Sequence, residues 1–194
     1  MATEVETPAR RSDVVDVIGF PGTGFGGYNR AVRILIALLV LLMADTVLAQ
    51  GAPKTVYFDG PVDKPNVDYT LRRLSPGDTL VINSRGGNGG EALRLAEFIR
   101  NNRVNTHVNT TGQAQSAAVI VYAAGHKRTA GKNAQFWLHM GKDKDGNESQ
   151  ELTKQYFQHL LRYGVNDKIT QLPVIQETLT LSPDMGRYVG LVTD

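Results

Sequence analysis

Hydrophobic residues follow two alternating patterns along the chain from residue 55 onward. Short apolar runs predict buried strands, and longer stretches with apolar residues three or four positions apart predict helices with one buried face. The predicted strands are 55–58, 79–83, 104–108, 127–130 and 135–139, and the predicted helices are 66–74, 91–101, 117–124, 151–163 and 183–189. Because strands and helices alternate, the pattern predicts an α/β fold with a mainly parallel sheet.

Four segments fall outside this pattern. Residues 84–90 are rich in glycine and predict a turn. Residues 110–115 and 141–150 are polar and predict surface loops. Residues 167–180 fit neither a helix nor a strand, because a proline interrupts them.

The N-terminal part contains one unbroken apolar run, residues 34–44. Arg30 and Arg33 precede the run, and Asp45 ends it. The run is short for a membrane span, which needs about 20 apolar residues. Small or apolar residues at Val47 to Ala49 complete the pattern of a secretory signal, with a basic flank, an apolar centre and a cleavage site.

We therefore expect two parts, a leader with its signal sequence at 1–49 and a folded domain at 50–194. This organisation predicts a periplasmic or secreted protein. The alternative is a membrane anchor formed by residues 31–49. Acidic residues before the apolar run are unusual for a signal, so a translation start near Val32 is a further possibility.

The composition of the chain limits the kinds of chemistry and the partners that we expect. The chain of 194 residues has no cysteine, which excludes a thiol nucleophile and cysteine-ligated metals. A net charge of +2 gives no reason to expect a nucleic-acid partner, and the four histidines are too scattered to predict a metal site. A G-x-G-x-x-G match at 22–27 lacks the βαβ context of a dinucleotide site, so we expect no cofactor.

Three features after residue 80 carry residue types that serve catalysis. They are the glycine-rich turn, Ser116 directly before an apolar helix, and His139 at the end of a predicted strand. A serine hydroxyl becomes a nucleophile when a base such as neutral histidine takes its proton. Glycine turns and helix N-termini leave backbone N–H groups free to hold an oxyanion. The combination is suited to acyl transfer.

Each feature also has a purely structural interpretation. A serine before a helix commonly caps it, a histidine after a strand is commonly packed in place, and a glycine cluster is commonly only a turn. Spacing in the sequence does not establish that Ser116 and His139 meet in the fold.

Four segments together resemble the proteolytic subunit of Clp protease and its relatives in the crotonase superfamily. They are VINSRGGNGGEAL (81–93), GQAQSAAVIVYAAGHKR (112–128), FWLHMG (136–141) and LSPDMGRYVGLV (181–192). The resemblance implies a Clp peptidase-like or crotonase-like spiral of repeated ββα units, in proteins that tend to form homo-oligomers. It also implies that Ser116 matches the nucleophile and His139 the general base. Gly87 and Ala117 match the backbone donors of the oxyanion hole.

The sequence departs from the family at the third catalytic position. The family has an aspartate three residues before its C-terminal Leu-Ser pair, where this chain has Thr178. Two nearby carboxylates, Glu177 and Asp184, are therefore candidates beside Thr178. Relatives such as signal peptide peptidase A use a lysine base, for which Lys154 is the candidate.

These observations predict a serine peptidase-like protein acting on peptides or unfolded proteins outside the cytoplasm through a Ser-His centre. The alternative is a catalytically impaired descendant that binds peptides or assembles through the same fold. Acyl-CoA chemistry, as in the hydratase relatives, is a weaker third hypothesis. If the protein is exported, neither a CoA substrate nor a Clp-type ATPase partner is expected.

Overall fold

The computed structural model describes residues 32, 34–36, 52–174 and 178–194. The chain divides into two units, residues 1–51 and residues 52–194. Of the apolar run at 34–44, residues 37–44 lie outside the described residues. Among the described residues, no helix has the length and apolar character needed to cross a bilayer.

The second unit contains a parallel sheet of four strands in the order β1-β2-β3-β5. The strands are β1 (Thr55–Asp59), β2 (Thr79–Asn83), β3 (Asn105–Val108) and β5 (Arg128–Ala130). A three-stranded sheet consists of β4 (Gln113–Gln115), β6 (Gln135–Leu138) and β9 (Leu179–Leu181). Strand β4 pairs with β6 in parallel, and β9 pairs with β6 antiparallel. The expected α/β fold with a mainly parallel sheet is confirmed.

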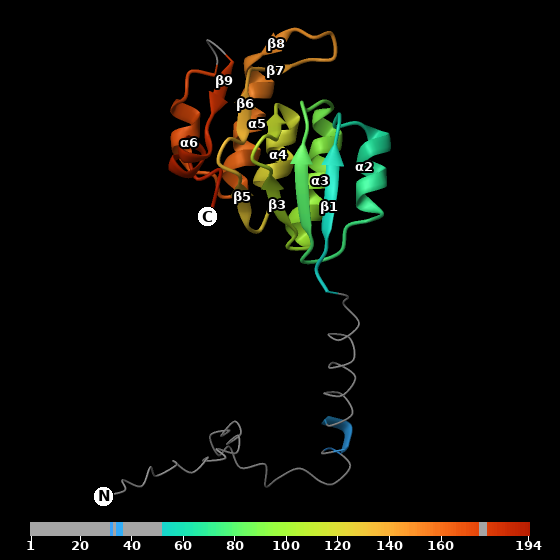
Figure 1. The fold of residues 1–194 in the computed structure, drawn as a ribbon. Helices are drawn as coiled ribbons and strands as arrows, with labels where there is room; N and C mark the ends of the chain where they lie inside the picture. The colour runs from blue at the N-terminus through green and yellow to red at the C-terminus, as the bar shows by residue number, and fades with distance from the viewer. Residues whose placement is uncertain (1–31, 33, 37–51, 175–177) are drawn as a thin grey trace, which may run out of the picture. The chain divides into compact units, whose positions relative to one another are not determined.

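Helices alternate with these strands (Figure 1). They are α2 (Lys64–Leu71), α3 (Gly89–Asn101), α4 (Ala117–Ala123), α5 (Gln150–Arg162), the 3-10 turn η1 (Asp167–Gln171) and α6 (Pro183–Tyr188). Helix α2 contacts β1 at one end of the fold, and α6 contacts β9 at the other. All seven residues of α4 are buried, which places this helix at the centre of the core.

Burial explains the strand patterns. In β1 the buried residues alternate, with Val56 and Phe58 inside and Tyr57 exposed, as expected for an edge strand with one covered face. In β2 three consecutive residues, 80–82, are buried, as expected for a strand covered on both faces.

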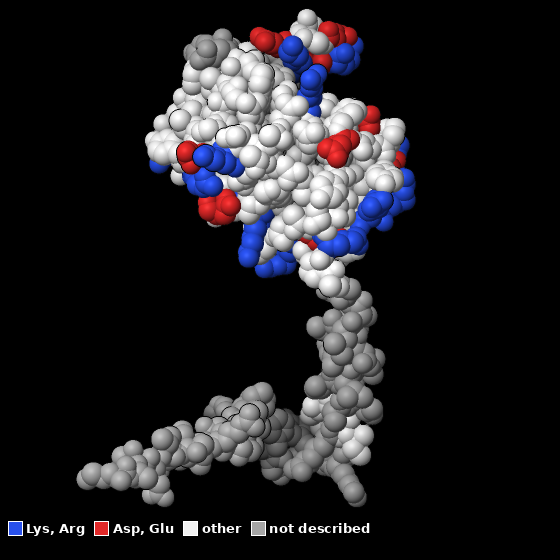
Figure 2. Space-filling view, in the orientation of Figure 1, with Lys and Arg blue, Asp and Glu red and all other residues white. Residues whose placement is uncertain are grey.

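Charged side chains mark the rim of this unit. Figure 2 shows a broad uncharged area over the strands, with Lys and Arg gathered toward the end where β1 begins. The hairpin of β7 (Gly141–Lys142) and β8 (Glu148–Ser149) carries charges of both signs.

Two sequence-based expectations about local structure are wrong. The polar segment 110–115 contains strand β4, because Ala114 is buried and the flanking glutamines pair with β6 through their backbones. The polar segment 141–150 contains the β7–β8 hairpin, closed by side-chain and backbone bonds around Asp143. Strand β6 ends at Leu138, one residue before the predicted bound, and His139 directly follows the strand.

Candidate active site

Ser116 occupies the turn between β4 and α4 in an unusual backbone conformation. Its φ is +52° and its ψ is −126°, a region that residues with a side chain rarely adopt and that costs about 1–3 kcal/mol. Its side chain makes no capping hydrogen bond to α4. Ser116 thus occupies the N-cap position of α4 without the side-chain cap that such a serine usually supplies, and its hydroxyl remains available for other chemistry.

Three hydrogen bonds hold this conformation. The Ser116 N–H donates to the carbonyl oxygen of Trp137 in β6, at 2.9 Å. The Ser116 carbonyl oxygen accepts from the Val119 N–H in α4 and from the Tyr156 hydroxyl in α5, each at 2.9 Å. The nucleophile candidate is thus tied to a strand and to two helices.

The glycine turn packs directly against Ser116. Gly86 has φ +86°, and a Cβ on it would lie 2.5 Å from the carbonyl oxygen of Gln115 and 2.8 Å from the Ser116 Cβ. Gly87 has φ +147°, and a Cβ there would overlap the carbonyl oxygen of Val62. Glycine is required at both positions, because a side chain on Gly86 would clash with the Ser116 turn and a side chain on Gly87 would clash with the Val62 backbone.

The N–H groups of Gly87 and Ala117 are unpaired among the described residues. Val62 bonds the turn on both sides of Gly87: its N–H donates to the Gly86 carbonyl oxygen, and its carbonyl oxygen accepts from the Asn88 N–H. Ala117 begins α4, where the first N–H groups have no acceptor within the helix. Both N–H groups belong to residues that line one cavity with Ser116, which is the arrangement that an oxyanion hole requires.

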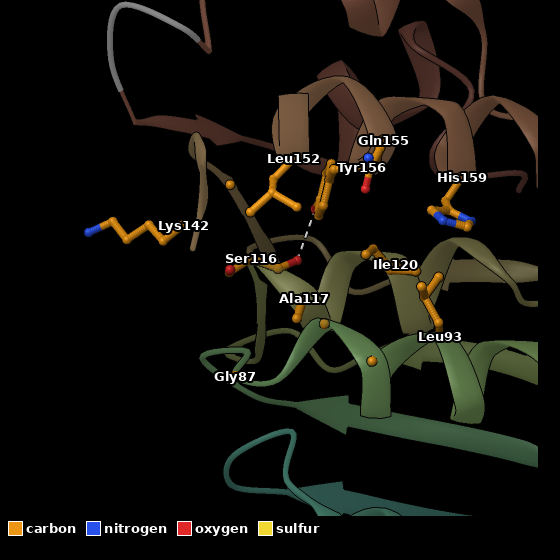
Figure 3. Close-up of a pocket in the computed structure, with 13 residues that line it drawn as sticks. Gly87, Leu93, Ser116, Ala117, Ile120, Lys142, Leu152, Gln155, Tyr156 and His159 are labelled. Atoms are coloured by element: carbon orange, nitrogen blue, oxygen red, sulfur yellow. Dashed lines mark hydrogen bonds between the residues drawn. The ribbon is translucent and has the colours of Figure 1, made fainter. Parts of the chain in front are cut away.

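This cavity has a volume of about 270 Å³ and lies between α3, α4 and α5. Its lining residues are Gly87, Gly89, Gly90, Leu93, Ser116, Ala117, Ile120, Gly141, Lys142, Leu152, Gln155, Tyr156 and His159. Figure 3 shows Leu93 and Ile120 on the side opposite α5, and His159 at the end away from Ser116. The exposed Lys142 extends away from the serine in this view.

The sequence-predicted base, His139, is not among the lining residues of this cavity. Its Nδ1 atom lies 2.5 Å from the carbonyl oxygen of Met140. Because a carbonyl only accepts, this hydrogen bond requires the proton on Nδ1 and leaves the Nε2 lone pair free. Among the described residues, no hydrogen bond joins His139 to Ser116.

The candidates for a third catalytic residue lie in different places. Thr178 is exposed and directly precedes β9; the pairing of Leu138 with Leu179, continued by one residue, places it opposite His139. Asp184 is at the start of α6, and its Oδ1 lies 3.0 Å from the Arg187 guanidinium. Glu177 lies outside the described residues.

The alternative base, Lys154, lies on another face of α5. It lines a separate cavity with Thr153 and Phe157, whereas Tyr156 and His159 face the cavity of Ser116. Within the described part of the chain, no three His, Asp or Glu side chains form a group suited to a metal ion.

The contribution of α5 was missed by sequence reasoning. Tyr156 lies on the apolar stripe of the predicted helix 151–163, where an aromatic residue is typical of a core position. Burial raises the pKa of the Tyr156 phenol above its usual range, so the hydroxyl stays protonated and donates. Nothing in the sequence spacing indicates that this hydroxyl meets the nucleophile turn forty residues earlier.

A serine at a strand-to-helix turn beside two free N–H groups is the arrangement of a serine hydrolase. The chain belongs to the Clp protease family, whose profile, described as Clp protease, matches residues 77–173. It is therefore a member of a Clp-like serine peptidase family. No curated protein matches the sequence significantly.

Solved structures share this fold. A serine-to-alanine mutant of the membrane-bound stomatin-specific protease 1510-N is 13% identical, with a TM-score of 0.57, and the match covers 74% of this chain and 79% of that one. A lysine-to-alanine mutant of the same protease, in complex with a substrate peptide, gives the same identity and TM-score, with 74% of each chain covered. An asparagine-to-aspartate mutant of ClpP1 from Listeria monocytogenes is 19% identical, with a TM-score of 0.53, and the match covers 79% of this chain and 93% of that one.

Proposed function

We propose that this protein is a serine endopeptidase in which Ser116 attacks the carbonyl carbon of a peptide bond. The observation that carries the proposal is the left-handed conformation of Ser116 next to the unpaired Gly87 and Ala117 N–H groups at one cavity. These two donors would hold the oxygen of the tetrahedral intermediate. One such donor contributes about 3–4 kcal/mol to the transition state in serine peptidases.

In this proposal His139 accepts and returns the protons. As the bond between Ser116 Oγ and the substrate carbon forms, the hydroxyl proton passes to Nε2 of His139, the ring nitrogen that carries no proton. The same proton then goes to the leaving amine as the C–N bond breaks. Water hydrolyses the resulting ester, with His139 again accepting and returning a proton. The proposal requires a movement of the region after β6 that brings the imidazole to the serine on substrate binding, since catalytic contacts in free enzymes are commonly longer.

A peptide substrate is supported by the cavity and by one relative. Leu93, Ile120 and Leu152 give the cavity apolar walls, which suit an apolar side chain of a peptide held at Ser116. The stomatin-specific protease mutant was solved with a substrate peptide. Peptides or unfolded proteins are therefore the proposed substrates, cleaved by a homo-oligomer as in the family.

We also propose that the protein is exported from the cytoplasm. The apolar run 34–44 with Arg30 and Arg33 before it supports a signal sequence, and with it a periplasmic or secreted enzyme that works without a Clp-type ATPase. N-terminal mass analysis of the protein from its native host tests this point. A mature chain that starts near residue 50 is expected, whereas retention of residues 31–49 in the membrane fraction would favour the anchor.

The catalytic proposal is tested with a fluorophosphonate, which reacts covalently with activated serines. We expect labelling of Ser116 in the folded protein, identified by mass spectrometry, and loss of labelling in both Ser116→Ala and His139→Ala. Labelling of the native protein that is no faster than that of the unfolded protein would reject the peptidase.

A second candidate function is a catalytically impaired protein that binds peptides. Two observations favour it: the threonine at the position of the family's aspartate, and the location of His139 outside the cavity of Ser116. This candidate predicts that peptides bind equally well to the native protein and to Ser116→Ala, and that neither protein cleaves them.

A further inference from the structure

The hydrogen bond from Tyr156 to the carbonyl oxygen of Ser116 links α5 to the nucleophile turn. The two oxygens are 2.9 Å apart, and Figure 3 shows this bond beside the cavity. In the same view the Ser116 hydroxyl points away from Tyr156. The phenol therefore contacts the backbone of the serine and leaves its nucleophilic oxygen free.

The geometry of the peptide bond couples this contact to the direction of the Ala117 N–H. The Ser116 carbonyl and the Ala117 N–H belong to one planar trans peptide, in which the C=O and N–H bonds point in opposite directions. Fixing the oxygen on one side fixes the direction of the N–H on the other. That N–H begins α4, has no partner among the described residues and belongs to a residue that lines the cavity.

We infer that Tyr156 is a positioning residue that holds the Ser116–Ala117 peptide in the orientation required for catalysis. Two backbone hydrogen bonds, to Trp137 and from Val119, also hold Ser116. In the described part of the chain, Tyr156 provides the one side-chain hydrogen bond to the Ser116 backbone. The left-handed φ at Ser116 needs such support, because serine does not adopt it without constraint.

This inference rests on the proposed peptidase function, and the matched control is another tyrosine that donates to a backbone carbonyl. Tyr122 in α4 donates from its hydroxyl to the carbonyl oxygen of Thr129, at 3.1 Å, and does not line the cavity. Tyr156→Phe and Tyr122→Phe therefore remove the same kind of hydrogen bond, and each keeps the aromatic ring. Only the first affects the nucleophile turn.

The first measurement is the second-order rate constant for labelling of Ser116 by a fluorophosphonate. We expect Tyr156→Phe to label about tenfold more slowly, which corresponds to the loss of one hydrogen bond at about 1.4 kcal/mol. Tyr122→Phe should label at the native rate. With a cleavable peptide, the same loss should appear in kcat, and KM should change less than twofold. Equal labelling rates for native protein and Tyr156→Phe would overturn the inference.

The second measurement does not depend on catalysis. The Ser116 amide donates to Trp137, so its hydrogen exchange rate reports on opening of the turn. We expect faster exchange of this amide in Tyr156→Phe than in Tyr122→Phe, at equal global stability. If the native protein is not labelled at Ser116, the peptidase proposal fails, and the exchange data alone decide the role of Tyr156. Unchanged exchange would overturn that role.

Discussion

The carbonyl oxygen of Met140 accepts the hydrogen bond from His139 Nδ1, at 2.5 Å, where serine peptidases of this family use a carboxylate. The residue opposite His139 in the continued β6–β9 register is Thr178. A carbonyl can fix the tautomer of the ring, but it carries no full charge to stabilise the imidazolium that forms in the reaction.

Thr178→Asp should therefore increase the reactivity of Ser116. A carboxylate at this position can accept the hydrogen bond from Nδ1–H and stabilise the charged ring, and loss of such a group in a triad costs orders of magnitude in rate. We expect at least about a tenfold faster fluorophosphonate labelling. Thr180→Asp is the control, because it adds the same charge on β9 opposite Trp137. Equal effects of the two variants would show that His139 does not serve as the base.

Much of the site could be predicted from the sequence because its parts are local. The glycine turn, Ser116 and Ala117 each fall within a short segment whose residue types require a given backbone, and the structure places Gly87, Ser116 and Ala117 at one cavity. Strand β2 and helix α3 could also be predicted from the sequence. A continuous apolar run indicates a strand buried on both faces, whereas apolar residues three or four positions apart indicate a helix with one buried face.

The rest depends on contacts between distant segments. Tyr156 reaches Ser116 only because α5 packs over α4, and an apolar stripe does not indicate which hydroxyl finds an acceptor. Strand β4 was not predicted, because the two glutamines on either side of the buried Ala114 give this segment the polar composition of a loop. Conversely, the serine that local preference assigns as a helix cap makes no capping bond, because its backbone is held in another conformation.

Gly87→Ala should abolish most of the activity. The added Cβ would overlap the Val62 carbonyl, and φ at this position is +147°, so the turn must shift and its N–H must leave the cavity. Loss of an oxyanion donor lowers kcat by about 10²–10³-fold. The measurement is kcat for peptide cleavage, or the labelling rate of Ser116. In the control, Gly60→Ala, φ is +105° and the nearest atom is 3.6 Å away, so stability should fall without this loss of rate.

Arg128→Met should destabilise the whole domain. The guanidinium is buried, has no carboxylate partner among the described residues, and donates to carbonyl oxygens of Leu191, Gly190, Tyr163, Ala123 and Gly125. These oxygens lie at or just beyond the C-termini of α4, α5 and α6. Burial lowers the pKa of Arg128 from its ordinary value, although the residue stays charged at neutral pH.

Without the guanidinium, several buried carbonyls lose their donor, at about 1–3 kcal/mol for each unsatisfied group. We therefore expect a decrease of several kcal/mol in the free energy of unfolding, measured by urea denaturation. Arg187→Met is the matched control. Its ion pair with Asp184 is exposed, and such pairs contribute about 0–1 kcal/mol. Similar unfolding midpoints for the two variants would contradict the role of Arg128.

Leu93→Trp should change which peptides are cleaved. The Leu93 side chain lines the cavity beside Ile120, so a larger ring there reduces the space for a substrate side chain (Figure 3). For peptides that differ only in the residue before the cleaved bond, the native protein should prefer leucine or phenylalanine over alanine. The variant should lose kcat/KM for phenylalanine by about 10-fold or more and retain it for alanine, since one pocket contact changes discrimination by about 1–3 kcal/mol. Leu161→Trp, on α5 outside this cavity, should leave the preference unchanged. If both variants cleave the series as the native protein does, the substrate side chain binds elsewhere.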